Sequence, residues 1–311
     1  MKLDSRTLNR GEVLFNRYTI IKKLGEGNYS FVYLAIDISI KKYFVIKEFF
    51  PHEFVNRKNN NKIFLKNTLI PSKIHQYNYL KLLFEKEAEN LKTINTSKHP
   101  GISNFISFHN NTNNSAYIVT DYVKTISLQT YLKKLKSPNQ LIKLANELLL
   151  TLEHIHYFNI YHQDVKIENI LIKKDKTPLI IDFGASPIIY DSMSGQYFNT
   201  ASPDSAALEQ LSLSYPPEIN NCTDIYAVAV LLYKILTKSC PINSKTRERT
   251  INQGYHDPYI PLTSKRLSCF NKKVLNAIDK ALSLYPEDRY STTEEFRKIL
   301  NAKTIKFPFF N

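Results

Sequence analysis

The chain has 311 residues, of which 42 are Lys or Arg and 28 are Asp or Glu, so its formal net charge is +14 at pH 7. A chain of this length exceeds the usual size of a single core, and we expect one large lobe or two closely joined lobes. Its three cysteines are odd in number and lack metal-ligand spacing, which supports neither a disulfide framework nor a zinc site: Cys222, Cys240 and Cys269.

Targeting and membrane signals are weak in this sequence. No apolar run of a signal peptide follows the first residues, and the longest apolar stretch, residues 225–233, is far shorter than the roughly 20 residues of a membrane helix. We therefore expect no transmembrane segment and a reducing compartment. The positive charge favours phosphate-bearing ligands and acidic partners, but a solvated lysine-rich surface is the simpler explanation. No recognised motif accompanies the charge, so no specific nucleic-acid partner is predicted.

The first third of the chain is rich in predicted strands. Residues 18–24, 31–36 and 43–48 have strand composition, and residues 25–30 form a turn between the first two. Only seven glycines occur in the whole protein, and Gly25 and Gly27 fall in this one turn. Glycine lets a backbone approach phosphate oxygens and adopt positive φ, so the turn is a candidate phosphate-binding loop.

A second stretch places several polar side chains around a predicted hairpin. The apolar runs 170–172 and 179–181 flank a polar turn, which puts Asp164 and Asn169 just before the first strand and Asp182 just after the second. A hairpin brings these two ends together. Asp164 can accept a proton from an alcohol, Lys166 can neutralise a moving phosphoryl group, and carboxylate and amide oxygens suit Mg²⁺.

These residues resemble the signature of the protein-kinase family. Residues 162–169, His-Gln-Asp-Val-Lys-Ile-Glu-Asn, are similar to its catalytic loop, and residues 182–184, Asp-Phe-Gly, to its metal-binding motif. The resemblance spans about residues 18–300 and implies an α+β fold with two lobes. A small β-rich N-lobe with one main helix is expected at 18–123, after a lead-in at 1–17, and a larger helical C-lobe at 124–311.

The resemblance also implies which residues bind nucleotide. Lys47 would hold the α and β phosphates and pair with a helix acid, for which Glu87 is favoured over Glu85 and Glu89. Thr120 takes the gatekeeper position, and Asp121 to Val123 would supply backbone groups for adenine. The implied cofactor-binding set is Leu24, Gly25, Gly27, Val32, Lys47, Glu87, Thr120, Asp121, Val123 and Leu171, with Asn169 and Asp182 as metal ligands.

Four positions depart from the family pattern. Ser30 replaces the third glycine of the loop, Val45 replaces an alanine beside the adenine pocket, and Leu208 precedes the expected glutamate. Gln163 replaces an arginine that pairs with a phosphate on the activation segment, and a neutral amide cannot form that charge-assisted contact. Activity is therefore predicted not to require phosphorylation of residues 182–209 through this route.

The remaining segments fit the expected lobes. Residues 49–78 are an insertion relative to a minimal kinase and resemble a small-lobe elaboration of some bacterial Ser/Thr kinases; a plain surface loop is the alternative. Helical periodicity marks residues 79–94, 141–155, 224–236, 271–284 and 293–300. By resemblance, Glu209 pairs with Arg289, Asp224 holds the catalytic-loop backbone, and His162 supports that loop from beneath.

The sequence therefore predicts a Ser/Thr protein kinase that uses ATP and Mg²⁺, with Asp164 as base and Lys166 beside the transferred phosphate. Ser202-Pro203, together with Lys166, points to Ser or Thr acceptors in a protein substrate. A pseudokinase scaffold that binds nucleotide without catalysis is the first alternative, and a basic nucleic-acid-binding module is the second. The expected location is a bacterial cytoplasm, with export into another cell left open, and the oligomeric state is unknown.

Overall fold

The computed structural model describes residues 5–27, 29–58, 61–183, 189–191, 196–198, 202, 204–211 and 218–301. The chain forms two compact units. Unit 1 is built mainly from the residues up to Lys98 and from Ser103–Val123. Unit 2 is built mainly from His99–Ile102 and from the chain after Lys124.

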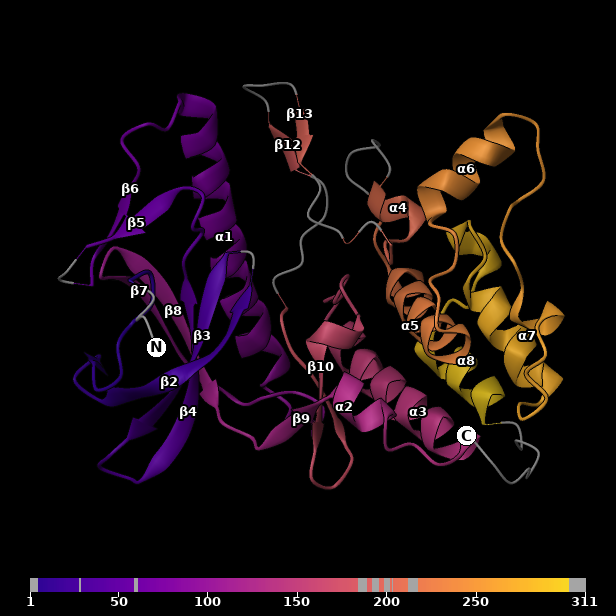
Figure 1. Ribbon diagram of the computed structural model, residues 1–311, viewed down its shortest axis with the longest axis horizontal. Coiled ribbons are helices and arrows are strands. Elements are labelled where there is room, and N and C mark those ends of the chain that lie inside the picture. Colours follow the sequence, from indigo (N-terminus) through magenta and orange to yellow (C-terminus); the bar gives the residue numbers. More distant parts are fainter. Residues whose placement is uncertain are drawn as a thin grey trace. The chain divides into compact units, whose positions relative to one another are not determined.

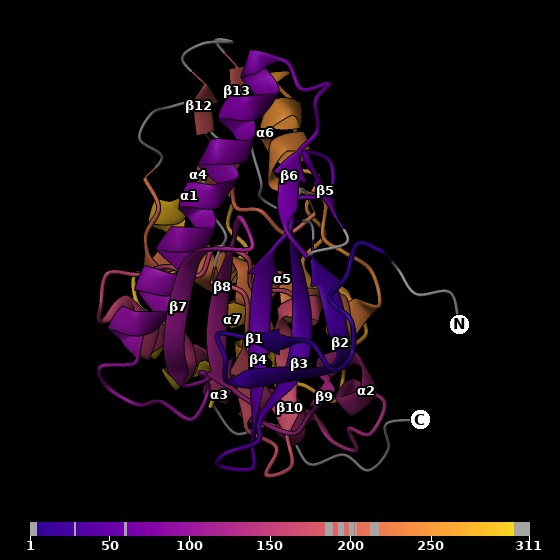
Figure 2. The same ribbon diagram turned by 90° about the vertical axis from the view of Figure 1, so that its left-hand side faces the viewer.

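Unit 1 contains a six-stranded antiparallel sheet in the order β1-β2-β3-β4-β8-β7. Figure 2 shows β2, β3, β4, β8 and β7 side by side. The predicted strands are confirmed, but they reach further into the glycine turn, because the chain stays paired up to Gly27 and again from Ser30. The sheet also has an edge strand that the sequence did not predict, β7, whose side chains are mostly half-buried or exposed. The strands are β1 Val13–Leu14, β2 Tyr18–Gly27, β3 Ser30–Asp37, β4 Lys42–Phe49, β7 Phe105–Thr112 and β8 Ser115–Asp121.

One long helix, α1 (Pro71–Ile94), belongs to unit 1 and packs against β7 and β8. It begins at Pro71 and not at residue 79 as predicted, since proline is well tolerated in the first turn of a helix. All of its buried side chains lie at Leu80 or later, so the apolar periodicity marked only the packed part. The predicted insertion holds a small hairpin, β5 Val55–Arg57 and β6 Ile63–Leu65, and then the first turns of α1.

Unit 2 is mostly helical and also holds the sheet β11-β10-β9 (Figure 1). The predicted helices are present, with α7 ending at Ala281 and not at residue 284, and the short polar helix α6 was not predicted because it lacks an apolar stripe. Its helices are α2 Leu128–Leu132, α3 Pro138–His156, α4 Leu208–Leu211, α5 Asn221–Thr237, α6 Ser244–Asn252, α7 Lys272–Ala281 and α8 Thr293–Leu300. Its strands are β9 Thr125–Ser127, β10 Ile170–Lys173 and β11 Pro178–Ile180, and a separate strand pair joins β12 Ile189–Asp191 to β13 Gln196–Phe198.

Helix α5 is the buried centre of unit 2. Residues from Cys222 to Tyr233 are all buried, and a capping box between Asn220 and Thr223 fixes its first turn. Across the described part of the chain, no helix combines the length and apolar character that a bilayer crossing needs. The apolar surface of α5 is instead covered by its own unit, which includes contacts with α3, α7 and α8.

A buried ion pair fastens α4 to the chain that precedes α8. Both guanidinium nitrogens of Arg289 donate to Glu209, at 2.8 and 3.1 Å, and the Arg289 side chain is fully buried. The same guanidinium donates to the carbonyl oxygens of Ser283, Leu284 and Cys222. The pairing predicted from the sequence is therefore confirmed.

We predict that Arg289→Met lowers the free energy of unfolding by about 3 to 5 kcal/mol, because it leaves the Glu209 carboxylate buried without its counter-charge. Urea denaturation followed by circular dichroism measures the change. Lys298→Met is the matched control, since Lys298 forms an exposed pair with Glu294 on α8 and should alter stability little. Equal effects of the two substitutions would contradict the assignment.

Candidate active site

A short loop between α3 and β10 carries the principal candidate residues. Asp164 and Lys166 precede a 3₁₀ turn at Ile167–Asn169, and β10 begins directly after it. The antiparallel pair β10 and β11 then returns the chain, so that the Ile181 N–H donates to the Asn169 carbonyl at 3.0 Å. Asn169 and Asp182, which are separated in sequence, are thereby neighbours at one end of the hairpin.

The buried carboxylate of Asp224 holds this loop from α5. Its two oxygens accept the backbone N–H groups of His162 and Gln163 at 2.8 and 2.7 Å, and it also bonds His156 Nε2 at 2.8 Å. Burial alone would raise the pKa of Asp224, but the hydrogen bond and charge of His156, with the His162 amide, hold it below its ordinary value. The predicted role of Asp224 is confirmed, and it supports Gln163 in a left-handed conformation with φ of 64°.

His162 lies below the loop, as predicted. Its Nε2 is 3.1 Å from the Ile181 carbonyl oxygen, its Nδ1 accepts the Asp164 N–H at 3.3 Å, and its ring meets Phe183 edge-on at 5.1 Å. His162 is buried, so these contacts use the side chain for support. They link the residue before Asp182 to the backbone of Asp164.

Asp164 lies at the centre of a compact polar cluster. Lys166 Nζ is 2.7 Å from one carboxylate oxygen of Asp164, and the Ser202 hydroxyl donates to the other at 3.0 Å. Lys166 also donates to the Ser202 hydroxyl at 3.0 Å. The Asn169 amide nitrogen bonds both the backbone and the side chain of Asp164, at 2.9 Å each. Ser202, which precedes α4 in the chain, therefore already places a hydroxyl against Asp164.

The chemistry of the donors fits a hard cation shared with phosphate. Because Asp164 takes up the Asn169 amide nitrogen, the side-chain oxygen of Asn169 is the atom that can ligate a metal. Asp182 supplies carboxylate oxygens beside it and has a left-handed backbone with φ of 69°. The described residues include no group of three or more His, Cys, Asp or Glu side chains that could hold a metal alone. A magnesium ion that keeps few protein ligands suits such a site.

In unit 1 the predicted lysine and glutamate are paired. Lys47 Nζ lies 2.7 Å from both carboxylate oxygens of Glu87, which is buried in α1. The two competing acids point elsewhere, because Glu85 accepts from Asn110 and Glu89 accepts from Lys86 on the exposed side of the helix. The structure thus favours Glu87, as the sequence did.

Lys47 shares one face of the sheet with several predicted nucleotide-binding residues. The β3–β4–β8 registers pair Val32 with Lys47 and Val45 with Thr120, and directly paired residues project to the same side. These four side chains are half-buried, whereas Tyr33, Ile46 and Val119 on the opposite face are fully buried. A polar lysine and threonine on a partly open apolar face are suited to bind a nucleotide.

The two glycines of the predicted turn lie in the paired part of the sheet. Gly25 and Gly27 both lie within β2, opposite Val32 and Ser30, and neither has a positive φ. Neither glycine uses the positive φ that this residue type allows, because the extended pairing continues almost to the tip of the hairpin. At Gly25 an added side chain would meet nothing within 4 Å, which leaves the backbone open to a close approach. Leu24, beside it, is exposed.

The last residue of β8 and the residue after it have part of their backbone engaged within unit 1. The Asp121 N–H donates to the Asn104 carbonyl, and the Tyr122 N–H donates to the Tyr43 carbonyl. The Asp121 side chain also accepts two hydrogen bonds from Asn104. Adenine contacts from Asp121 and Val123 stay a prediction, as does the contribution of Leu171, a half-buried residue of β10 in unit 2.

Two residues near Asp164 were missed by sequence reasoning. The Gln210 amide donates to the Gln163 carbonyl at 2.8 Å, and its oxygen accepts the Ala207 N–H at 3.0 Å. His156 bonds Asp224, as described above. Neither residue has a local pattern that marks it, because each acts through a partner far away in sequence. Of the predicted motif, Gly184 lies outside the described residues.

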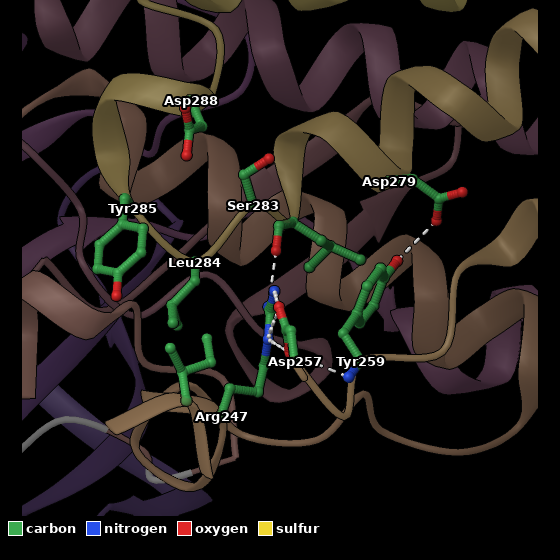
Figure 3. Close-up of a pocket in the computed structure, with 10 residues that line it drawn as sticks. Arg247, Asp257, Tyr259, Asp279, Ser283, Leu284, Tyr285 and Asp288 are labelled. Carbon is green, nitrogen blue, oxygen red and sulfur yellow. Dashed lines mark hydrogen bonds and ion pairs between the residues drawn. The ribbon is translucent and has the colours of Figure 1, made fainter. Parts of the chain in front are cut away.

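A cavity in unit 2, with a volume of about 320 Å³, lies among α6, α7 and the chain around them (Figure 3). Its polar side chains are largely committed to one another. Arg247 donates to both carboxylate oxygens of Asp257 and to the Leu282 carbonyl, and Asp279 accepts from Tyr259 and Thr263. The lining includes none of the predicted site residues.

The fold and the site together define the class of protein. One unit has an antiparallel sheet, which carries a lysine, and one long helix, which carries the glutamate that pairs with it. The other unit is helical and holds the loop that carries the aspartate. Together these are the features of a protein kinase domain. The family described as protein kinase domain matches residues 18–302. The chain belongs to this family, and the predicted fold class is confirmed.

Similar proteins agree with this assignment. The chain is 27% identical to serine/threonine-protein kinase D of Synechocystis over 93% of its length and 52% of that protein. It is 25% identical to serine/threonine-protein kinase PknA of Nostoc, over 96% of its length and 49% of that protein. The chain thus spans about half the length of these curated relatives. The solved structure of PpkA-294 in its apo form is 26% identical, with a TM-score of 0.80, and covers 96% of this chain and 100% of that chain.

We predict that Asp224→Asn lowers the free energy of unfolding at pH 7 by about 1 to 3 kcal/mol, because one amide group replaces a carboxylate that accepts three hydrogen bonds. The folded-state pKa of Asp224 lies below its unfolded value, so its charge stabilises the fold above about pH 4. That contribution is lost as the pH falls through the folded-state pKa.

The difference between wild type and Asp224→Asn should therefore narrow in acid. Urea denaturation at pH 7 and at successively lower pH values measures it. A difference that stays constant from pH 7 down to the acid-unfolding range would contradict the role of the charged carboxylate.

Proposed function

We propose that this protein is an ATP- and Mg²⁺-dependent kinase that transfers the γ-phosphoryl group to Ser or Thr hydroxyls of a protein substrate. The observation that carries the proposal is the bond from the Ser202 hydroxyl to Asp164, with Lys166 in contact with both groups. A serine hydroxyl beside a carboxylate and a lysine is the arrangement that proton transfer from an alcohol requires. A protein substrate would present its own hydroxyl to Asp164.

Each residue then has a separate task. Asp164 accepts the proton of the attacking hydroxyl, and Lys166 neutralises charge on the phosphoryl group as it moves. Asn169 and Asp182 would hold Mg²⁺, which supplies charge neutralisation at the phosphate oxygens. Lys47, oriented by Glu87, would bind the α and β phosphates.

The nucleotide would also contact the residues that share its face of the sheet. Val32 and Val45 would offer apolar surface to the base. Thr120, which pairs with Val45, would limit how deeply the base enters the site. The extended backbone at Gly25 allows a phosphate to approach closely. Backbone groups of Asp121 and Val123 would bind the adenine edge, with Leu24 and Leu171 as further apolar contacts.

We predict that Asp164→Ala reduces phosphoryl transfer by about 10²- to 10⁴-fold, which is the contribution of a positioned proton acceptor. Nucleotide affinity should change little, because Asp164 acts on the hydroxyl and not on ATP. Transfer of labelled γ-phosphate to a generic protein acceptor measures the first quantity, and fluorescence titration with mant-ATP measures the second.

Asp175→Ala is the matched control for this experiment, since Asp175 is an exposed aspartate in the turn between β10 and β11. Its activity should equal that of wild type. A wild-type protein that binds mant-ATP with Mg²⁺ but never transfers phosphate would favour the alternative, a nucleotide-binding scaffold.

We also predict that treatment with a phosphatase leaves the rate of transfer unchanged. Gln163 is neutral, and its backbone is held by Asp224 and Gln210, so the loop has supports that need no phosphate. Rates before and after treatment, with mass spectrometry to verify removal of phosphate, measure the effect. An enzyme that loses activity and recovers it on re-phosphorylation of one residue in 182–209 would contradict this proposal.

A further inference from the structure

The residue after Lys47 is a completely buried glutamate. Glu48 has no exposed surface, and its carboxylate accepts the hydroxyls of Tyr33 at 2.9 Å and Tyr117 at 2.7 Å. Arg57, on strand β5, donates to the same carboxylate at 2.6 Å, and its side chain is 3% exposed. Burying a charge costs free energy because the charge loses its hydration, even when three donors bind it. The position of this charge in the fold therefore needs a physical explanation.

Glu48 lies on the face of β4 opposite to Lys47. Successive side chains of a strand alternate between the two faces, so Lys47 projects towards the half-buried face of the sheet and Glu48 towards the other. The register places Phe31 and Tyr117 on either side of Glu48. The buried network therefore contacts β4, the strand that carries Lys47, on the face of the sheet opposite to that lysine.

The hairpin of β5 and β6 covers this rear face through Arg57. The guanidinium donates to the carbonyl oxygens of Arg6 and Asn61 as well as to Glu48, and it lies over the Phe50 ring at 5.0 Å. Phe50 in turn packs on Phe31, with ring centroids 4.9 Å apart. The hairpin is thus joined to the sheet by both charge and aromatic contacts.

The lead-in segment before β2 covers the same face. The Leu8 N–H donates to the Tyr33 hydroxyl at 3.1 Å, and the carbonyl of Arg6 accepts from Arg57. Phe15 stacks on His109 at 3.6 Å and meets Tyr117 edge-on, although its φ of 56° is unusual for a bulky residue. Arg6 also pairs with Glu26, between the two glycines of β2.

Residues 5–17 lie outside the part of the chain that matches the kinase family, which begins at residue 18. They nevertheless touch both the glycine-containing end of β2 and the network behind Lys47. Burial raises the pKa of Glu48, while Arg57 and the two phenol hydroxyls oppose that rise. Apolar side chains alone are sufficient to cover this face. We therefore interpret the buried charge as a group that fixes the geometry of the residues bound to it.

We propose that Glu48 is a positioning residue for Lys47. By binding Tyr33, Tyr117 and Arg57 at once, its carboxylate fixes β4 against the sheet, and it fastens the lead-in and the β5–β6 hairpin as a rigid cover on the rear face. This inference rests on the proposed function, in which Lys47 binds the phosphates of ATP. The cover is therefore part of the nucleotide-binding apparatus, although Glu48 projects from the face of the sheet opposite to Lys47.

The test compares Glu48→Gln with wild type in the full chain. We expect the KM for ATP and the dissociation constant of mant-ATP to rise about tenfold to a hundredfold, the range that small misplacements of a binding group produce. The KM for the protein acceptor should not change. A merely structural role would lower the folded fraction, which reduces kcat and leaves both constants for nucleotide as they are.

Two further variants separate charge from packing. Arg57→Met leaves the Glu48 carboxylate buried without its counter-charge and should impair nucleotide binding more than Glu48→Gln does. The double variant Glu48→Gln/Arg57→Met, which has no uncompensated charge, should bind nucleotide better than Arg57→Met alone. The control is Glu89→Gln, which removes an exposed carboxylate from α1 and should behave as wild type.

These experiments distinguish failure of the positioning role from failure of the proposed function. Wild type that binds mant-ATP, together with Glu48→Gln of unchanged affinity, would overturn the positioning role alone. Wild type that does not bind mant-ATP at all would overturn both proposals. If Glu48→Gln does not fold, Tyr117→Phe removes one hydrogen bond from the same carboxylate, and a folded Tyr117→Phe with an unchanged KM for ATP would equally reject the inference.

Discussion

The buried carboxylate of Asp224 is the contact on which the candidate active site depends. It accepts two consecutive backbone N–H groups, those of His162 and Gln163, and so fixes the chain immediately before Asp164. Because Asp224 lies in the first turn of α5, the buried central helix of unit 2, this loop is anchored to the buried core of that unit. Asp164, Lys166 and Asn169 can then be held in place on a loop that would otherwise move.

Buried charges recur at the joints of this protein. Glu209 with Arg289 ties α4 to the chain before α8, Arg247 with Asp257 ties α6 to the following loop, and Glu48 with Arg57 ties the β5–β6 hairpin to the sheet. Such pairs are weak sources of net stability because desolvation offsets the attraction. They do require one geometry, since a displaced partner leaves a charge unpaired in the interior. These ion pairs therefore fix the positions of connecting segments against the helices and the sheet.

The candidate site contains two kinds of residue, those that would bind ligands and those that support them. The residues that would touch ATP or the acceptor differ in burial, since Asp182 is exposed, Lys47 and Asp164 are half-buried and Asn169 is buried. The residues that hold them are all buried: Glu87 behind Lys47, and Asp224 and His162 behind Asp164. Burial removes competing water and so strengthens the hydrogen bonds of the supporting groups. The exposed groups need access to ligands, and the buried groups supply the rigidity.

The sequence by itself determined much of the fold and the identity of the candidate residues. Apolar periodicity is a local property, so it marked the main strands and helices, and motif spacing identified Lys47, Asp164, Asn169 and Asp182. Glu87 was chosen among three neighbouring acids by its place on the helix, and the structure pairs it with Lys47.

Only the tertiary structure decided the features that depend on distant partners or on weak local signals. The start of α1 at Pro71, the strand β7 and the helix α6 escaped prediction because their buried apolar patterns are short or absent. The network of Glu48 joins Tyr33, Arg57 and Tyr117 from three separate segments, and no local pattern marks a charged residue for burial. Burial and pairing of polar groups are set by which segments meet in space, and that information lies in the folded chain as a whole.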